Sequence, residues 1–176
     1  RGYEELAKKP ESYEICFIPD NDYRGFLKRR VEGLEEEVKG GNFVNTAGEV
    51  IGTHDGYPFY TIGQRKLGVS FGADASYVVE IRPETNEVVV GSKEDLKRLE
   101  MYVKGLNLVK YNHIPDGTEA LTKVRYKHPG ELATLSNEGK EIKALFHAKV
   151  EGIAPGQSAV FYEGNDLLGG GFIAKK

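Results

Sequence analysis

The chain has 176 residues, of which 39% are apolar and 29% are charged, which predicts a folded protein of one ordinary domain or two small ones. No apolar run reaches the roughly 20 residues that a membrane helix needs, so we expect no membrane partner. Lys and Arg total 24 against 27 Asp and Glu, a net charge of -3, so bulk charge does not favour nucleic-acid binding.

The first part of the chain predicts a small mixed domain. Alternation predicts a strand over 13–18, and the short polar side chains after Pro19 predict the start of a helix with an apolar stripe and a basic end. Residues 34–41 read as acidic surface, and 42–54 as a hairpin that turns at 47–49. Further strands are expected over 59–62, 77–81 and 88–90. A capping box at 92–95 predicts a short helix through Leu99 and a domain boundary, giving a central domain over 1–100.

The second part, residues 101–176, predicts a C-terminal β-barrel, so the whole fold is expected to be mainly β with a helix or two. Short alternating runs separated by glycine turns predict six strands, over 102–109, 120–126, 132–136, 142–146, 159–162 and 167–173. Gly169, Gly170 and Gly171 lie inside the last of these and open no helix. They predict close backbone packing rather than a phosphate-binding loop, and we expect no ATP-binding site in this sequence.

Cys16 is the only cysteine, which excludes an internal disulfide framework and fits a reducing cytoplasm. Free cysteine usually packs as a small buried hydrophobe. Cys16, however, ends the expected strand just before a helix N-terminus, where a positive dipole lowers the pKa of a thiol. From the residues alone, a structural and a reactive cysteine both remain open. The four histidines have no metal-like spacing, so no metal site is expected.

Several phrases, taken in order, resemble the central and C-terminal regions of the bacterial tRNA-specific 2-thiouridylase family. They are EICFI at 14–18, GTHDG at 52–56, YTIGQR at 60–65, VRY at 124–126, PGQSAVFY at 155–162 and LGGG at 168–171. The resemblance runs from about Lys9 to Ile173. The family's N-terminal ATP-pyrophosphatase domain, with its SGGVDS-type loop, has no counterpart here, and the opening at Arg1 without a methionine suggests a segment of something longer.

The resemblance implies an enzyme that replaces the C2 oxygen of the tRNA wobble uridine with sulfur. ATP adenylates the oxygen, and a cysteine persulfide in the ICFI-type segment, here Cys16, delivers the sulfur. A second cysteine, in the absent domain, is implied either to release the sulfur by forming a disulfide with Cys16 or to assist the attack. The implied partners are tRNA, a persulfide-donating sulfur-relay protein or cysteine desulfurase, and the absent domain. The fragment alone is expected to bind no cofactor and to be inactive, because ATP is used through that domain.

The resemblance also places tRNA contacts at Arg125, Tyr126 and Gln157. The residues themselves add Lys123 and Lys127, because 123, 125 and 127 share a face if they alternate along one strand. Tyr126 would then point to the opposite face, unless a bulge or strand end intervenes. The alternatives are a solvated edge strand, and, for the whole chain, a translation-factor-like RNA-binding barrel with a structural cysteine, or a persulfide carrier that never meets RNA.

Overall fold

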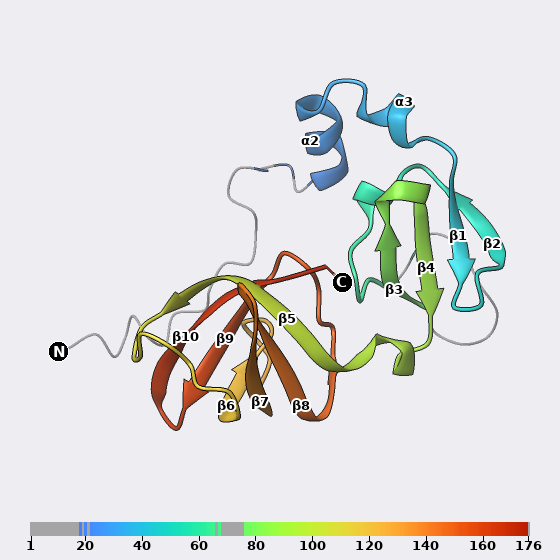
Figure 1. Cartoon of the computed structure of the whole chain (residues 1–176). Coiled ribbons are helices and arrows are strands. Elements are labelled where there is room, and N and C mark those ends of the chain that lie inside the picture. The colour runs from blue at the N-terminus through green and yellow to red at the C-terminus, as the bar shows by residue number, and fades with distance from the viewer. Residues whose placement is uncertain (1–17, 19, 21, 66, 68–75, 176) are drawn as a thin grey trace.

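The computed structural model describes residues 18, 20, 22–65, 67 and 76–175 (Figure 1). Cys16 and nearly all of the strand expected over 13–18 therefore lie outside the described residues. The described part is mainly β, as the sequence predicts. A four-stranded sheet with two short helices lies beside a barrel, and one continuous chain passes from the first to the second.

The sheet has the strand order β2-β1-β4-β3, in which β1 runs parallel to β4 and the other pairs are antiparallel. Its strands are β1 (Gly41–Asn45), β2 (Val50–His54), β3 (Tyr77–Arg82) and β4 (Glu87–Gly91). The helical elements of this part are α2 (Tyr23–Arg30), α3 (Leu34–Val38), η1 (Tyr57–Phe59), η2 (Pro83–Thr85) and η3 (Glu94–Leu96). The hairpin expected over 42–54 is confirmed as β1 and β2.

The barrel is closed by six antiparallel strands in the order β10-β5-β8-β7-β6-β9, which confirms the expected six-stranded barrel. They are β5 (Lys97–Leu108), β6 (Thr118–Lys123), β7 (Glu131–Glu138), β8 (Glu141–Glu151), β9 (Ser158–Glu163) and β10 (Asp166–Ile173). Alternate apolar residues of these strands fill the interior, among them Val103, Leu135, Ile142 and Phe161.

The close packing expected of the three glycines in β10 is confirmed. A Cβ at Gly170 would lie 2.3 Å from the carbonyl oxygen of Ala159 on β9, and one at Gly171 would lie 2.5 Å from that of Lys104 on β5. A side chain at either position would push the neighbouring strand away. The glycines therefore serve barrel closure.

The start of α2 is as expected, because the Asp22 side chain accepts a hydrogen bond of 2.9 Å from the backbone N–H of Gly25. The acidic segment after it is more than surface. Leu34 and Val38, four residues apart on α3, are buried in the apolar cluster beneath the sheet, while the glutamates between them face solvent. Among the described residues, no helix is both long and apolar enough to cross a membrane.

Two expected elements are wrong. Residues 59–62 form no strand, because η1 with Pro58 turns the chain and a second turn is closed by the Gln64 N–H on the Thr61 carbonyl at 2.9 Å. The helix expected to reach Leu99 is only the three-residue η3. Ser92 and Asp95 do bond each other as a capping box does, but buried Leu96 packs against the sheet and the next residue already enters β5.

Candidate nucleic-acid interface

Arg125 and Tyr126 lie in the loop that follows β6, not on the strand. β6 ends at Lys123, the Val124 side chain turns into the barrel core, and the His128 N–H donates to the Arg125 carbonyl at 3.0 Å to close a turn. The expectation that positions 123, 125 and 127 alternate along one strand is therefore wrong. Because both residues lie beyond the end of β6, strand alternation does not assign the Arg125 and Tyr126 side chains to opposite faces. The Tyr126 side chain is 68% exposed.

The two flanking lysines are not aligned with Arg125 by a common strand. Lys123 is the last residue of β6, and its ammonium lies 5.9 Å from the ring centroid of Tyr162 on β9. Lys127 lies in the turn directly after Tyr126 and is exposed. Any basic surface here is therefore built by a loop and the end of one strand.

Arg125 holds the segment that leaves β8, which we call the 151–157 segment. Its Nη1 donates a hydrogen bond of 2.7 Å to the Glu151 carbonyl oxygen. Gly152 follows with φ of 75°, and a Cβ on it would lie 2.7 Å from the same guanidinium nitrogen. Glycine at 152 therefore permits the close approach of Arg125.

The other end of the 151–157 segment carries Gln157. The Gly156 N–H donates to the Ile173 carbonyl at 2.9 Å, and the Ile173 N–H returns a bond of 2.8 Å to the Gln157 carbonyl. These bonds fix the turn against the end of β10, while the Gln157 side chain is exposed. Two predicted contacts that are distant in the sequence, Arg125 and Gln157, thus lie at the two ends of one anchored segment.

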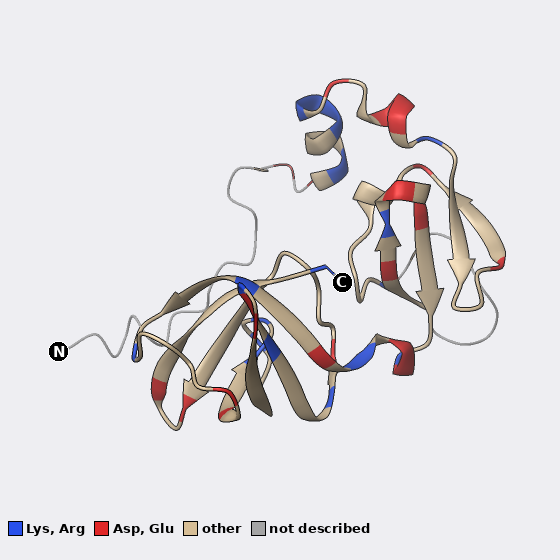
Figure 2. Cartoon of the chain, viewed as in Figure 1, with Lys and Arg blue, Asp and Glu red and all other residues tan. Residues whose placement is uncertain are grey.

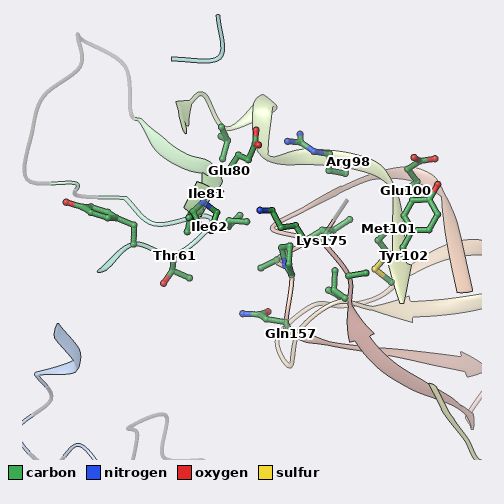
Figure 3. A pocket seen from close by; sticks show the side chains of 18 residues that line it. Thr61, Ile62, Glu80, Ile81, Arg98, Glu100, Met101, Tyr102, Gln157 and Lys175 are labelled. Carbon is green, nitrogen blue, oxygen red and sulfur yellow. The ribbon is translucent and has the colours of Figure 1, made fainter. Parts of the chain in front are cut away.

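The middle of the segment lines a cavity of about 630 Å³, which we call the sheet–barrel cleft (Figure 3). The sheet side supplies residues around β3 and the turn before it, and the barrel side supplies β5, the 151–157 segment and the end of β10. The lining includes Tyr60, Thr61, Ile62, Glu80, Ile81, Arg98, Glu100, Met101, Tyr102, Ile153, Pro155, Gln157, Ile173 and Lys175.

The YTIGQR phrase shapes the sheet side of this cleft. The Gly63 N–H bonds the Val78 carbonyl at 2.8 Å, and the Val78 N–H returns a bond of 3.1 Å to Gln64. The Gln64 side chain accepts from the Thr61 N–H at 3.0 Å. These bonds attach the phrase to β3 and place Thr61 and Ile62 at the cleft. The YTIGQR phrase is recognisable in the sequence, but only the structure shows that it lines the sheet–barrel cleft.

His54 in the GTHDG phrase has a structural role. It is buried, its ring lies 5.0 Å from that of Phe43 and 5.3 Å from that of Tyr60, and its Nδ1 accepts the Gly56 N–H at 3.0 Å. Burial is the main cause that lowers the pKa of His54 below its usual value. The ring is therefore neutral at neutral pH and orders the turn after β2.

The basic end of α2 is matched by acidic neighbours (Figure 2). Arg29 pairs with Asp20 at 3.1 Å, and Lys28 pairs with Glu35 on α3 at 2.5 Å. Both pairs are solvent-exposed. Two of the three cations at this helix end are thus paired within the fold, and the third, Arg30, lies 5.6 Å from the ring centroid of Phe26, in line with a surface role. Elsewhere in the described part of the chain, no group of His, Cys, Asp and Glu side chains is arranged to hold a metal ion.

Comparisons with known proteins cover nearly the whole chain. A family model described as tRNA methyl transferase PRC-barrel domain matches residues 24–92, and one described as aminomethyltransferase beta-barrel domain matches 98–173. The tRNA-specific 2-thiouridylase MnmA of Cytophaga hutchinsonii is 55% identical over 98% of this chain, and that of Amoebophilus asiaticus is 56% identical over 98%. The same enzyme of Carboxydothermus hydrogenoformans is 49% identical over 97%.

The chain spans about half the length of these relatives, 47%, 46% and 46% of each. The first match covers the helices and sheet, and the second covers the barrel from β5 to β10. With both models matched in order and with relatives of this identity, the chain belongs to the tRNA-specific 2-thiouridylase family.

Proposed function

We propose that this chain holds tRNA and carries sulfur on Cys16 for the ATP-dependent 2-thiolation of the wobble uridine. The observation that carries the proposal is the identity of about half of all residues with tRNA-specific 2-thiouridylases over nearly the whole chain. ATP binding belongs, in this proposal, to a part of the protein other than these 176 residues, because their sequence holds no SGGVDS-type loop.

The proposed chemistry uses two cysteines, one ATP and one sulfur atom loaded on Cys16 as a persulfide. Attack of the uridine C2 oxygen on ATP releases pyrophosphate and leaves an adenylated oxygen. The terminal sulfur of the Cys16 persulfide attacks C2, and AMP departs with the oxygen. A second cysteine thiolate, outside this chain, attacks Cys16. The resulting disulfide releases the sulfur as the thiocarbonyl, and the two thiols supply the electrons that reduce it. An external thiol reductant then reduces the disulfide to two cysteine thiols, and a cysteine desulfurase or a sulfur-relay protein reloads Cys16 with sulfur.

In this proposal the barrel loops hold the tRNA. We expect Arg125 to bind a phosphate, because its guanidinium donates one N–H to the Glu151 carbonyl oxygen and has four more N–H donors. Tyr126, 68% exposed in the same loop, can stack on an unpaired base, a contact worth about 1–3 kcal/mol. Gln157 offers an amide from the far end of the 151–157 segment. Lys123 and Lys127 add charge near the loop.

The tRNA-binding part is tested by measuring the affinity of the chain for an unmodified tRNA transcript with uridine at the wobble position. We expect Arg125→Ala to weaken binding about tenfold and to reduce the salt dependence by about one phosphate contact. Lys140→Ala is the matched control. Lys140 lies just before the first residue of β8, and Arg125 bonds Glu151, the last residue of this 11-residue strand. Lys140 and the Arg125 contact are therefore separated by about 35 Å of extended strand. Equal effects of the two substitutions would contradict the assignment of Arg125.

A further inference from the structure

The walls of the sheet–barrel cleft are apolar. Ile62 and Ile81 on the sheet side face a barrel side that includes Met101, Ile153 and Ile173. The volume of about 630 Å³ lies within the range of sites that enclose small ligands, and it exceeds the volume of a single nucleotide. The cleft can therefore accommodate a planar base between its two walls.

Four charged side chains surround the opening, and the two acidic ones are engaged outside it. Glu80 bonds Arg82 at 2.9 Å, and Glu100 bonds Lys143 at 2.9 Å. Neither Arg82 nor Lys143 lines the cleft. The two carboxylates are thus neutralised by cations outside the cleft. Of the lining cations, Arg98 donates from Nη1 to the Asp95 and Lys97 carbonyl oxygens at 2.5 and 3.2 Å. Lys175 pairs with Glu84.

Lys175 reaches across from the barrel to the sheet. Its backbone is fixed by the preceding residue, because the Ala174 N–H donates to the Tyr102 carbonyl at 2.8 Å. Its Nζ bonds the two carboxylate oxygens of Glu84 on η2 at 2.9 and 3.1 Å. The Lys175 and Glu84 side chains are 53% and 72% exposed, and such exposed pairs contribute little to stability. Lys175 can therefore exchange Glu84 for another anion at small cost.

The cleft is continuous with the tRNA contacts proposed above. Gln157 lines the cleft itself, and the residues between it and Glu151, which Arg125 holds, form part of the barrel wall. Figure 3 shows Lys175 between the labelled residues of the sheet and Gln157. An RNA strand that meets Arg125 and Gln157 thus passes the mouth of the cleft. Proteins that read single-stranded RNA combine such features, an aromatic or apolar slot for an unstacked base and cations for its phosphate.

We propose that the sheet–barrel cleft takes up one unstacked nucleotide of the bound tRNA, with the base between the apolar walls and the phosphate on Lys175 in place of Glu84. This inference rests on the proposed function, because it takes tRNA as the ligand. It adds a second recognition point that spans the sheet and the barrel. tRNA binding would then fix these two parts relative to each other.

The uptake of a base by the sheet–barrel cleft is tested by filling the cleft with a larger side chain. Thr61 is exposed at the cleft, so Thr61→Trp blocks the opening without adding charge. We expect this variant to bind the same unmodified tRNA transcript about tenfold more weakly, with an unchanged slope of affinity against salt. The control is Thr53→Trp, because Thr53 is exposed on β2, at the sheet edge opposite to β3. Thr61→Trp binding equal to that of the control would overturn the inference.

The phosphate contact is tested by breaking the same ion pair from its two sides. Lys175→Ala removes the cation, and we expect weaker tRNA binding with a salt slope reduced by about one contact. Glu84→Gln breaks the pair but leaves the cation free, so affinity should stay equal or rise. Equal weakening by both variants would show that the pair only braces the two parts, and would overturn the role of Lys175. Unfolding midpoints of each variant show that it remains folded.

Failure of this inference differs from failure of the proposed function. If Arg125→Ala weakens tRNA binding while Thr61→Trp and Lys175→Ala bind as wild type, the cleft assignment alone is wrong. If the unaltered chain has no measurable affinity for the transcript, the proposed tRNA-holding function fails, and the cleft assignment fails with it. A 5-bromouridine placed in the anticodon loop adds a direct readout, since we expect its photocrosslinks at Tyr60 or Met101, which line the cleft.

Discussion

At the residue scale, His54 couples the fold of the sheet to pH. Burial lowers its pKa in the folded state, so the unfolded chain binds more protons between that lowered pKa and the ordinary value near 6.5. Stability therefore rises with pH through this window, and the contribution of neutral His54 is lost as pH falls below it. Burial is also the largest cause that lowers the pKa of His128, so His128 changes the stability with pH in the same direction.

We expect the free energy of unfolding to fall between about pH 8 and about pH 5, with part of the fall due to His54. His54→Asn keeps an acceptor near the Gly56 N–H but cannot titrate, so its stability should depend less on pH, even though the smaller side chain lowers stability at every pH. Urea unfolding of the two proteins at both pH values measures this. If the free energy of unfolding of the variant falls as much with pH, then His128 and other groups cause the whole pH dependence and His54 contributes nothing to it.

Asn86 shows what single residues contribute that sequence patterns do not reveal. It adopts a left-handed conformation with φ of 50°, its Nδ2 donates to the Val38 carbonyl at 2.6 Å, and its Oδ1 accepts the Tyr57 N–H at 3.3 Å. In the sequence it is only a polar residue between the strands expected over 77–81 and 88–90. Its partners are 48 and 29 residues away along the chain, and only the folded sheet brings them together.

At the element scale, the glycines of β10 determine how closely the barrel strands approach. Gly170→Ala would place a Cβ 2.3 Å from the Ala159 carbonyl oxygen, and backbone on a neighbouring strand cannot move aside as a flexible side chain can. We expect a loss of about 2–3 kcal/mol in the free energy of unfolding. Gly139→Ala, in an open turn with φ of 67°, should cost only the backbone strain of about 1–2 kcal/mol.

Denaturant unfolding of both glycine variants compares the two costs directly. The expected order is that Gly170→Ala is the less stable protein. A Gly170→Ala variant as stable as Gly139→Ala would mean that β9 and β10 separate easily, and that the run of glycines has another purpose.

Elements were predictable from the sequence where one face of a strand is buried, and less so at their ends. Alternating apolar residues identified all six barrel strands, because every one has an inner and an outer face. The end of β6 was missed, because buried Val124 continues the apolar alternation beyond Lys123 although it already lies in a bend. The strand expected over 59–62 was wrong for a related reason. Buried aromatic residues there resemble a strand, but their backbone is turned by η1.

At the scale of the whole molecule, the candidate interface depends on tertiary contacts. The resemblance identified Arg125, Tyr126 and Gln157. The residues alone did not show that Arg125 bonds one end of the 151–157 segment and that Gln157 lies at the other end. The sheet–barrel cleft could not be predicted, because it forms between two parts whose relative position no local pattern encodes. Lys175 and Glu84, which meet across it, carry no sequence signal that relates them.

The proposed chemistry is divided between these 176 residues and a part that supplies ATP binding and a second cysteine. A suitable whole protein can be made by joining this chain to the part of the Cytophaga hutchinsonii relative that it does not match, since the chain spans 47% of that relative. In the proposed account, the part taken from the relative supplies ATP binding and the second cysteine. The joined protein also leaves Cys16 as the only cysteine contributed by this chain.

The most direct test is the formation of 2-thiouridine in tRNA by this joined protein, measured by mass spectrometry of the tRNA nucleosides. The protein is supplied with ATP, a cysteine desulfurase, cysteine and a thiol reductant. We predict thiolation by the unaltered protein and none by Cys16→Ser, with tRNA affinity the same in both, because serine cannot hold a persulfide sulfur. Near-normal thiolation by Cys16→Ser would contradict the account.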